Sequence, residues 1–158
     1  MKFWGAPRAI AARVAGERAL AFAALGDDGW LVGTREALHV LTDTDVRVPW
    51  ETVRAAEWDP DLDALSVSYV DGREPDTFTL SDAGRILQLI RERVTASVVV
   101  QRPVRASVAR GAIIVARQAP TGGPIEWSVD HRGSVDLSDP SVAAAISDAL
   151  AHAKAELD

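Results

Sequence analysis

The sequence predicts an α+β protein, and three patterns carry that prediction. Between residues 17 and 80, apolar and polar residues alternate with a period of two over several short runs, each closed by a turn. This pattern is typical of antiparallel strands with one buried face. Residues 81–97 then place apolar side chains at helical spacing, and residues 112–157 repeat the order of strands followed by a helix. We therefore expect antiparallel strands closed by an amphipathic helix, with an additional C-terminal β-hairpin plus helix.

Composition narrows the class of protein. A chain of 158 residues buries about 70% of its unfolded surface, so it needs no disulfide or metal to fold. The absence of cysteine excludes disulfides and thiolate metal sites. No apolar run approaches the roughly 20 residues that cross a bilayer, and Arg8 and Arg13 interrupt the apolar centre of any signal peptide. These features predict a cytoplasmic protein.

Charge is distributed unevenly along the chain, although the net charge is only −6. Residues 1–16 carry +3 and residues 17–82 carry −10, whereas residues 85–132 carry +5 and the last 26 residues carry −4. The basic block predicts either a surface for an anionic partner or an internal partner for the acidic block.

Residues 1–15 predict a short N-terminal helix that starts at Pro7 and stops near Gly16. Ile10 and Val14 lie four residues apart, on one face of that helix. One interpretation is an anchor in a membrane interface, with aromatic residues before the stripe and cations beside it. The other is a helix docked on its own domain. We favour docking, because so short a helix is marginal alone.

The strands of residues 17–80 predict one main core. Residues 17–25 are a strand candidate, and the Gly-Asp-Asp-Gly of residues 26–29 predicts a hairpin to the next strand. Alternation along the strands and the helical stripe together select the buried side chains. The expected members are Trp30, Val32, Leu38, Val40, Trp50, Trp58, Leu65, Val67, Phe78, Ile86, Leu87 and Ile90.

We expect one helix after the strands of residues 17–80 and a second helix after the C-terminal hairpin. Ser81 is the expected cap of the first, which we end near Ser97. Asp139 followed by Pro140 predicts the start of the second. Its apolar stripe from Val142 to Leu157, together with Trp127 of the preceding hairpin, should be buried, either within the chain or across a homodimer. Removing residues 103–158 should then leave a loosely folded first part.

The order of strands and closing helix resembles the pleckstrin-homology-like (PH-like) fold. The segments GERALAFAALGDDGWLVGTREALHVL, VPWETVRAAEWD and SDAGRILQLIRERV are similar to bacterial PH-like domains. The whole chain, with RERVTASVVVQRPV and VDLSDPSVAAAISDAL, resembles uncharacterised actinobacterial proteins built on such a domain. The resemblance implies bent antiparallel β-sheets closed by an amphipathic helix. The PH-like domain covers residues 16–98. We expect the short helix at 1–15 before it and a smaller unit at 99–158 packed on it.

The sequence contains no grouping that predicts an enzyme, a cofactor or a metal site. No two histidines have the spacing of metal ligands. The acidic run of residues 59–63 has Ala64 and Val70 where a calcium loop needs glycine and glutamate. Ser128, Asp130 and Ser134 surround His131, but neighbours in sequence do not make a catalytic triad. We predict a protein that is not an enzyme.

Binding is the remaining class of function. Phosphoinositide head groups are disfavoured, because residues 26–29 would place acids where PH-like lipid binders place cations. PH-like domains also bind peptides, which predicts a groove between residues 76–80 and 84–94 where a strand could add to the sheet edge. The function expected is therefore protein interaction or scaffolding, including self-association.

An anionic ligand or nucleic acid is the alternative function. Arginines recur through residues 102–132 and could form a basic surface, although only one aromatic residue is present there for base stacking. This possible interaction surface comprises Arg102, Arg105, Arg110, Arg117, Arg132 and Trp127.

Overall fold

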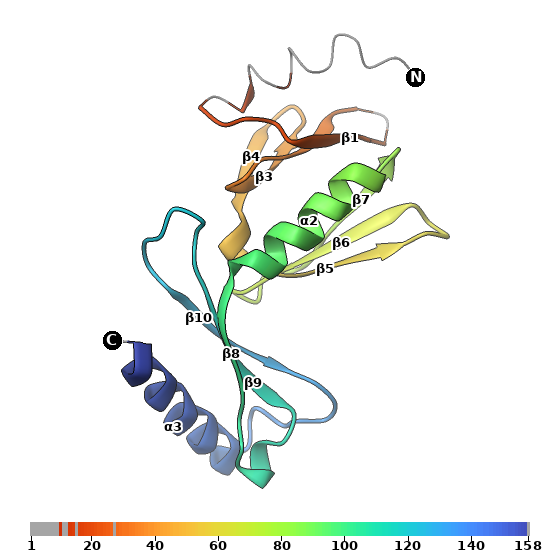
Figure 1. The fold of residues 1–158 in the computed structure, drawn as a ribbon. Coiled ribbons are helices and arrows are strands. Elements are labelled where there is room, and N and C mark those ends of the chain that lie inside the picture. Colours follow the sequence, from red (N-terminus) through yellow and green to blue (C-terminus); the bar gives the residue numbers. More distant parts are fainter. Residues whose placement is uncertain (1–9, 11–12, 15, 27, 158) are drawn as a thin grey trace. The chain divides into compact units, whose positions relative to one another are not determined.

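The computed structural model describes residues 10, 13–14, 16–26 and 28–157 (Figure 1). It divides the chain into two compact units. The first comprises residues 1–97 with 119–123, and the second comprises residues 98–118 with 124–158. The expected α+β class is confirmed, because the described residues form a seven-stranded antiparallel sheet, a three-stranded antiparallel sheet and helices. That the second unit packs on the first stays a prediction.

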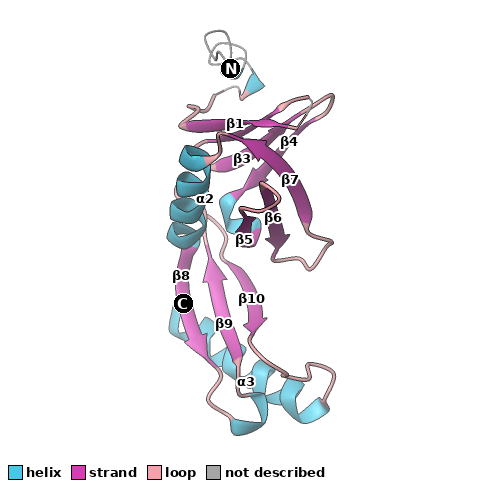
Figure 2. Ribbon diagram, turned by 90° about the vertical axis from the view of Figure 1, so that its right-hand side faces the viewer, coloured by secondary structure: helices cyan, strands magenta, loops and turns pink. Residues whose placement is uncertain are grey.

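The first unit is a curled sheet with a helix against it (Figures 1 and 2). Its strand order is β4-β3-β2-β1-β7-β6-β5, so β4 and β5 are the edge strands. Helix α2 contacts β1, β2, β5 and the 3-10 turn η1. In chain order the elements are β1 (Ala21–Leu25), β2 (Trp30–Gly33), β3 (Ala37–Leu41), β4 (Asp45–Pro49), η1 (Trp50–Thr52), β5 (Val53–Asp59), β6 (Ala64–Tyr69), β7 (Asp76–Ser81) and α2 (Gly84–Ser97).

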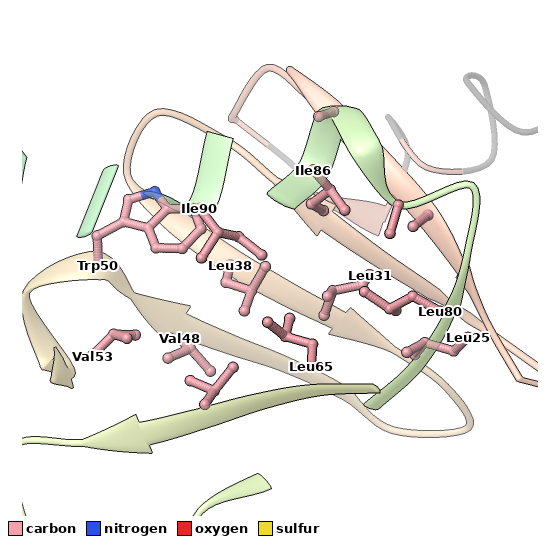
Figure 3. Close-up of a cluster of buried hydrophobic side chains, with 14 of the residues drawn as sticks. Leu25, Leu31, Leu38, Val48, Trp50, Val53, Leu65, Leu80, Ile86 and Ile90 are labelled. Atoms are coloured by element: carbon pink, nitrogen blue, oxygen red, sulfur yellow. The ribbon is translucent and has the colours of Figure 1, made fainter. Parts of the chain in front are cut away.

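The main core lies between the sheet and α2 (Figure 3). Leu31 pairs with Val40, and Gly33 pairs with Leu38, so this side of β2 and β3 faces the core. From α2, Ile86 and Ile90 enter the same cluster. Nearly all of the expected core is confirmed, either buried within this cluster or partly buried against it: Leu38, Val40, Trp50, Trp58, Leu65, Val67, Phe78, Ile86, Leu87 and Ile90.

The prediction was wrong for Trp30 and Val32. Both belong to a second cluster on the opposite face of β2, where Val32 packs with Ile10 and Val14. Alternation places Leu31 in the main core and its two neighbours outside it. Because Ile10 and Val14 pack on that second face, both faces of β2 are apolar, and alternation alone could not tell which face met α2.

Burial of Ile10 and Val14, each 1% exposed, supports docking of the N-terminal segment on its own unit. The amide of Val14 donates to the carbonyl oxygen of Ile10 at 3.1 Å, as in a helical turn. The rest of the helix expected over residues 1–15 lies outside the described residues.

Helix α2 begins later than the expected cap. Ser81 is the last residue of β7, and Asp82 takes a left-handed backbone with φ of 51° before the helix starts. The carbonyl oxygen of Ala83 accepts the first helical hydrogen bond, from Leu87 at 2.9 Å. The expected end near Ser97 is confirmed.

The second unit is a three-stranded sheet with a helix packed on one face (Figure 2). Its elements are β8 (Val98–Pro103), η2 (Ser107–Ala109), β9 (Ala112–Arg117), β10 (Glu126–His131) and α3 (Pro140–Leu157). Strand β8 adds a third strand to the expected hairpin, because Val98–Pro103 pairs with β9. Asp139 caps α3 as expected, accepting from the amide of Ser141 at 2.9 Å.

Candidate protein-binding site

Strand β5 forms an open edge of the seven-stranded sheet. Its only neighbour in the sheet is β6, and their register pairs Ala56 with Val67 and Trp58 with Leu65. An edge strand presents amide and carbonyl groups that can pair with another extended chain.

A pocket of about 300 Å³ lies between β5 and α2. We call it the β5–α2 pocket, and every residue that lines it belongs to the first unit. Side-chain alternation turns Trp58 of β5 toward the core side of the sheet, beside Leu65. Helical spacing brings the matching residues of α2 to one face. The apolar lining comprises Trp58, Leu65, Leu87, Ile90 and Val94.

Two arginines line the same pocket. Arg54 comes from β5 and Arg91 from α2, and both are exposed. The volume lies at the lower end of the range for ligand sites, so it suits one large side chain rather than a whole cofactor. The pocket can therefore receive an apolar side chain beside a negative charge.

The peptide groove expected beside residues 76–80 stays a prediction. Strand β7 lies between β1 and β6 in the sheet, and β1 pairs with its last two residues, Leu80 and Ser81. Strand β5, by contrast, is an edge of the sheet that also contacts α2. The curl of the sheet brings β5 under the helix, and sequence order gave no signal of it.

Of the arginines expected to form a basic surface over residues 102–132, one is buried and another is paired with a carboxylate. Arg102 pairs with Glu156 of α3. Arg117 is 3% exposed, and its guanidinium donates to Ser128 Oγ at 2.7 Å and to Asp130 Oδ2 at 3.3 Å. Arg105, Arg110 and Arg132 are exposed.

Trp127 packs against the cluster between the smaller sheet and α3, together with Val142 and Ala153. It is half-buried rather than fully buried. Leu157, at the end of the expected stripe, is 46% exposed. The expected burial therefore holds for Val142 and Ala153, in part for Trp127, and fails for Leu157.

Two of the three histidines, His39 and His152, lie beside carboxylates. His39 Nε2 lies 3.3 Å from Glu17 Oε2, on the face of β3 away from the main core. Glu17 also accepts from Thr34 Oγ1 at 2.7 Å and from Arg47 Nε at 3.0 Å. Burial raises the pKa of Glu17, but the hydrogen bonds from Arg47, Thr34 and His39 outweigh it and leave the pKa below its ordinary value of 4.5.

Ser128 and Asp130 share one side of β10 and bind Arg117, whereas His131 falls on the other side by alternation. His152 lies on α3, 3.1 Å from Glu156. Among residues 10, 13–14, 16–26 and 28–157, no group of three or more histidine, aspartate or glutamate side chains could hold a metal ion.

No family model, curated protein or solved structure matches this chain. The candidate site therefore rests on its own geometry. Within the described residues, no helix combines the length and the apolar character that crossing a bilayer requires.

Proposed function

We propose that this protein is a non-enzymatic protein-interaction module of the PH-like class. The partner would be an extended peptide that adds as a strand to β5. One large apolar side chain of the peptide would enter the β5–α2 pocket, and an acidic neighbour would lie beside Arg54 and Arg91. The observation that carries this proposal is the coincidence of an open sheet edge with an apolar pocket under a helix.

Support for the PH-like class comes from the order of the strands. Four strands in meander are joined through β1 to a three-strand meander, and the helix follows the last strand. This is the outline of bent antiparallel sheets closed by an amphipathic helix. The cytoplasmic location stays a prediction from composition, and the actinobacterial origin stays a prediction from the resemblance.

Recognition by strand addition divides affinity and specificity between two kinds of contact. Main-chain hydrogen bonds to an edge strand hold any extended sequence, and pockets for alternate side chains select among sequences. Here the β5–α2 pocket would select a large apolar residue. A charge-assisted contact to arginine would add preference for an acidic neighbour.

Selection from a library of displayed random peptides, with the full chain as target, tests this proposal. We expect enriched peptides with a large apolar residue next to an acid. Thr95→Trp should abolish their binding, because Thr95 is exposed and lines the pocket, where an indole would fill the space. Arg91→Glu should weaken binding about tenfold or more.

The matched control is Arg85→Glu, which reverses an exposed charge on the same helix outside the pocket. It should leave the affinity within about twofold of the unmodified chain. Peptides that bind the Thr95→Trp variant as tightly would contradict the proposal. A second copy of this chain as the occupant would instead appear as concentration-dependent dimerisation that Thr95→Trp abolishes.

A further inference from the structure

A second pocket of the first unit has the composition of a small-molecule site. It measures about 550 Å³ and is lined by residues 16–18, 20, 34–36, 89, 92 and 93. Its walls are thus the segment before β1, the turn between β2 and β3, and the last turns of α2. It shares no lining residue with the β5–α2 pocket, and its volume is ordinary for a small ligand. We call it the arginine pocket.

Three arginines from three different parts of the chain line the arginine pocket: Arg18, Arg35 and Arg93. Within the described part of the chain, none of the three side chains makes a hydrogen bond or an ion pair. Each of the three guanidinium groups carries five donors in a fixed fork. An anion in the hollow would engage these donors.

The acids of the same pocket are bonded to other residues. Glu17 accepts from Arg47 Nε at 3.0 Å, and Glu36 lies 3.6 Å from Arg47 Nη2. Glu92 accepts from Gln88 Nε2 at 3.2 Å. None of these contacts of the three carboxylates is with Arg18, Arg35 or Arg93.

Two leucines give the arginine pocket an apolar part. Leu20 is 46% exposed. Leu89 of α2 lies directly over Gly33 of β2, where an added Cβ would come within 2.4 Å of Leu89 Cδ2. The glycine thus lets Leu89 approach the sheet and form a wall of the pocket.

We infer that the arginine pocket binds a small amphiphilic anion. Its anionic group, such as a carboxylate, pairs with Arg18, Arg35 and Arg93 through charge-assisted hydrogen bonds, which arginine makes in bidentate geometry. Its apolar body covers Leu20 and Leu89 and removes their surface from water. This site is independent of peptide addition at β5, since the two use different residues.

Titration of the full chain with octanoate tests the inference, by calorimetry and by amide chemical shifts. Octanoate supplies one carboxylate on an apolar chain; 1-octanol and octylamine supply the same chain without charge and with the opposite charge. We expect saturable octanoate binding with a dissociation constant of about 1 mM, the range for a ligand of about ten non-hydrogen atoms. The shifts should centre on residues 16–20, 34–36 and 89–93. The alcohol and the amine should bind at least tenfold more weakly.

Variants separate the contribution of the arginines to octanoate binding from the contribution of Leu20. Combining Arg35→Ala with Arg93→Ala should weaken octanoate binding at least tenfold, and Leu20→Ala should weaken it about threefold. Arg85→Ala, on the same helix outside the pocket, should change it less than twofold. All four substitutions fall at exposed or half-exposed side chains, so folding should persist and an unchanged melting temperature would verify it.

Three results would each overturn the inference. One is the absence of octanoate binding at about 20 mM, well above the expected constant. Another is octanol binding as tightly as octanoate. The third is an unchanged affinity in the double arginine variant.

Discussion

The indole Nε1 of Trp50 donates a 2.9 Å hydrogen bond to the carbonyl oxygen of Thr34. Trp50 begins η1 and is 1% exposed in the main core, whereas Thr34 directly follows β2. The bond ties the turn between β4 and β5 to the end of β2, and it satisfies the single polar atom of the largest buried side chain.

Trp50→Phe should therefore destabilise the fold by more than its loss of volume. The phenyl ring leaves a cavity and leaves the Thr34 carbonyl without its indole donor, for a total of about 2–4 kcal/mol. Urea denaturation would measure the change in the free energy of unfolding. Trp58→Phe is the matched control, because Trp58 is only partly buried against the same core, and should cost about 1 kcal/mol. Equal costs would contradict the role assigned to the Trp50 bond.

Glu17 should make stability depend on pH in the acid range. Its pKa in the folded chain lies below its ordinary value of 4.5, through hydrogen bonds from Arg47, Thr34 and His39 that outweigh the opposing effect of burial. Between the lowered pKa of the folded chain and pH 4.5, this carboxyl binds more protons in the unfolded chain than in the folded chain. The stabilisation is therefore complete above about pH 4.5 and is lost as the pH falls through the lowered pKa.

In Glu17→Gln this contribution disappears. The slope of unfolding free energy against pH below 4.5 should become shallower than in the unmodified chain, as measured by urea titrations at several pH values. Glu57→Gln, at an exposed position of β5, should leave the slope in place. An identical slope in Glu17→Gln would show that the cluster around Glu17 does not couple to folding.

The first unit should fold without the second. Its two buried clusters draw only on residues 10–94, and the cluster under α3 draws only on residues 104–153. Because none of these clusters combines residues of both units, we expect the truncated chain to fold. The sequence alone predicted that it would be loosely folded. A fragment of residues 1–102, which lacks residues 119–123 of the first unit but keeps both of its buried clusters, should give dispersed amide shifts and one cooperative unfolding transition. A fragment that is insoluble or lacks dispersion would restore the sequence-based prediction.

Nucleic-acid binding through residues 102–132 should be absent. Arg102 is paired with Glu156, and Arg117 is enclosed with Ser128 and Asp130, so few cations remain to replace counterions. A mobility-shift assay with single- and double-stranded probes should show no retention at about 50 mM salt. Retention that falls steeply by about 200 mM, and is lost when Arg102, Arg105 and Arg110 become glutamate, would favour the nucleic-acid alternative.

Local patterns predicted the elements, because strand and helix periodicities are properties of short segments. Alternation correctly selected Leu38, Leu65 and Val67 for the main core. It failed at Trp30 and Val32, because a distant segment carrying Ile10 and Val14 covers the second face of β2. Which face of a strand meets which layer depends on contacts between residues far apart in the chain.

The sequence indicated what kind of binding site to expect, but not where in the fold it lies. It indicated a peptide groove beside the closing helix, but the curl of the sheet, which has no local signal, brings the edge strand β5 to that helix. The three arginines of the arginine pocket lie at positions 18, 35 and 93, too far apart for any motif to join them. The arginines that do cluster in sequence are divided by the structure between ion pairs and open surface.

Amide hydrogen exchange along β5 tests the central claim most directly. The full chain would be compared with and without a peptide selected against it, following residues 53–59. If the peptide adds as a strand, outward-facing amides of β5 become protected, and those of β4, the other edge strand, exchange as before. Saturating peptide that leaves exchange of residues 53–59 unchanged would contradict strand addition at β5 and with it the proposed function.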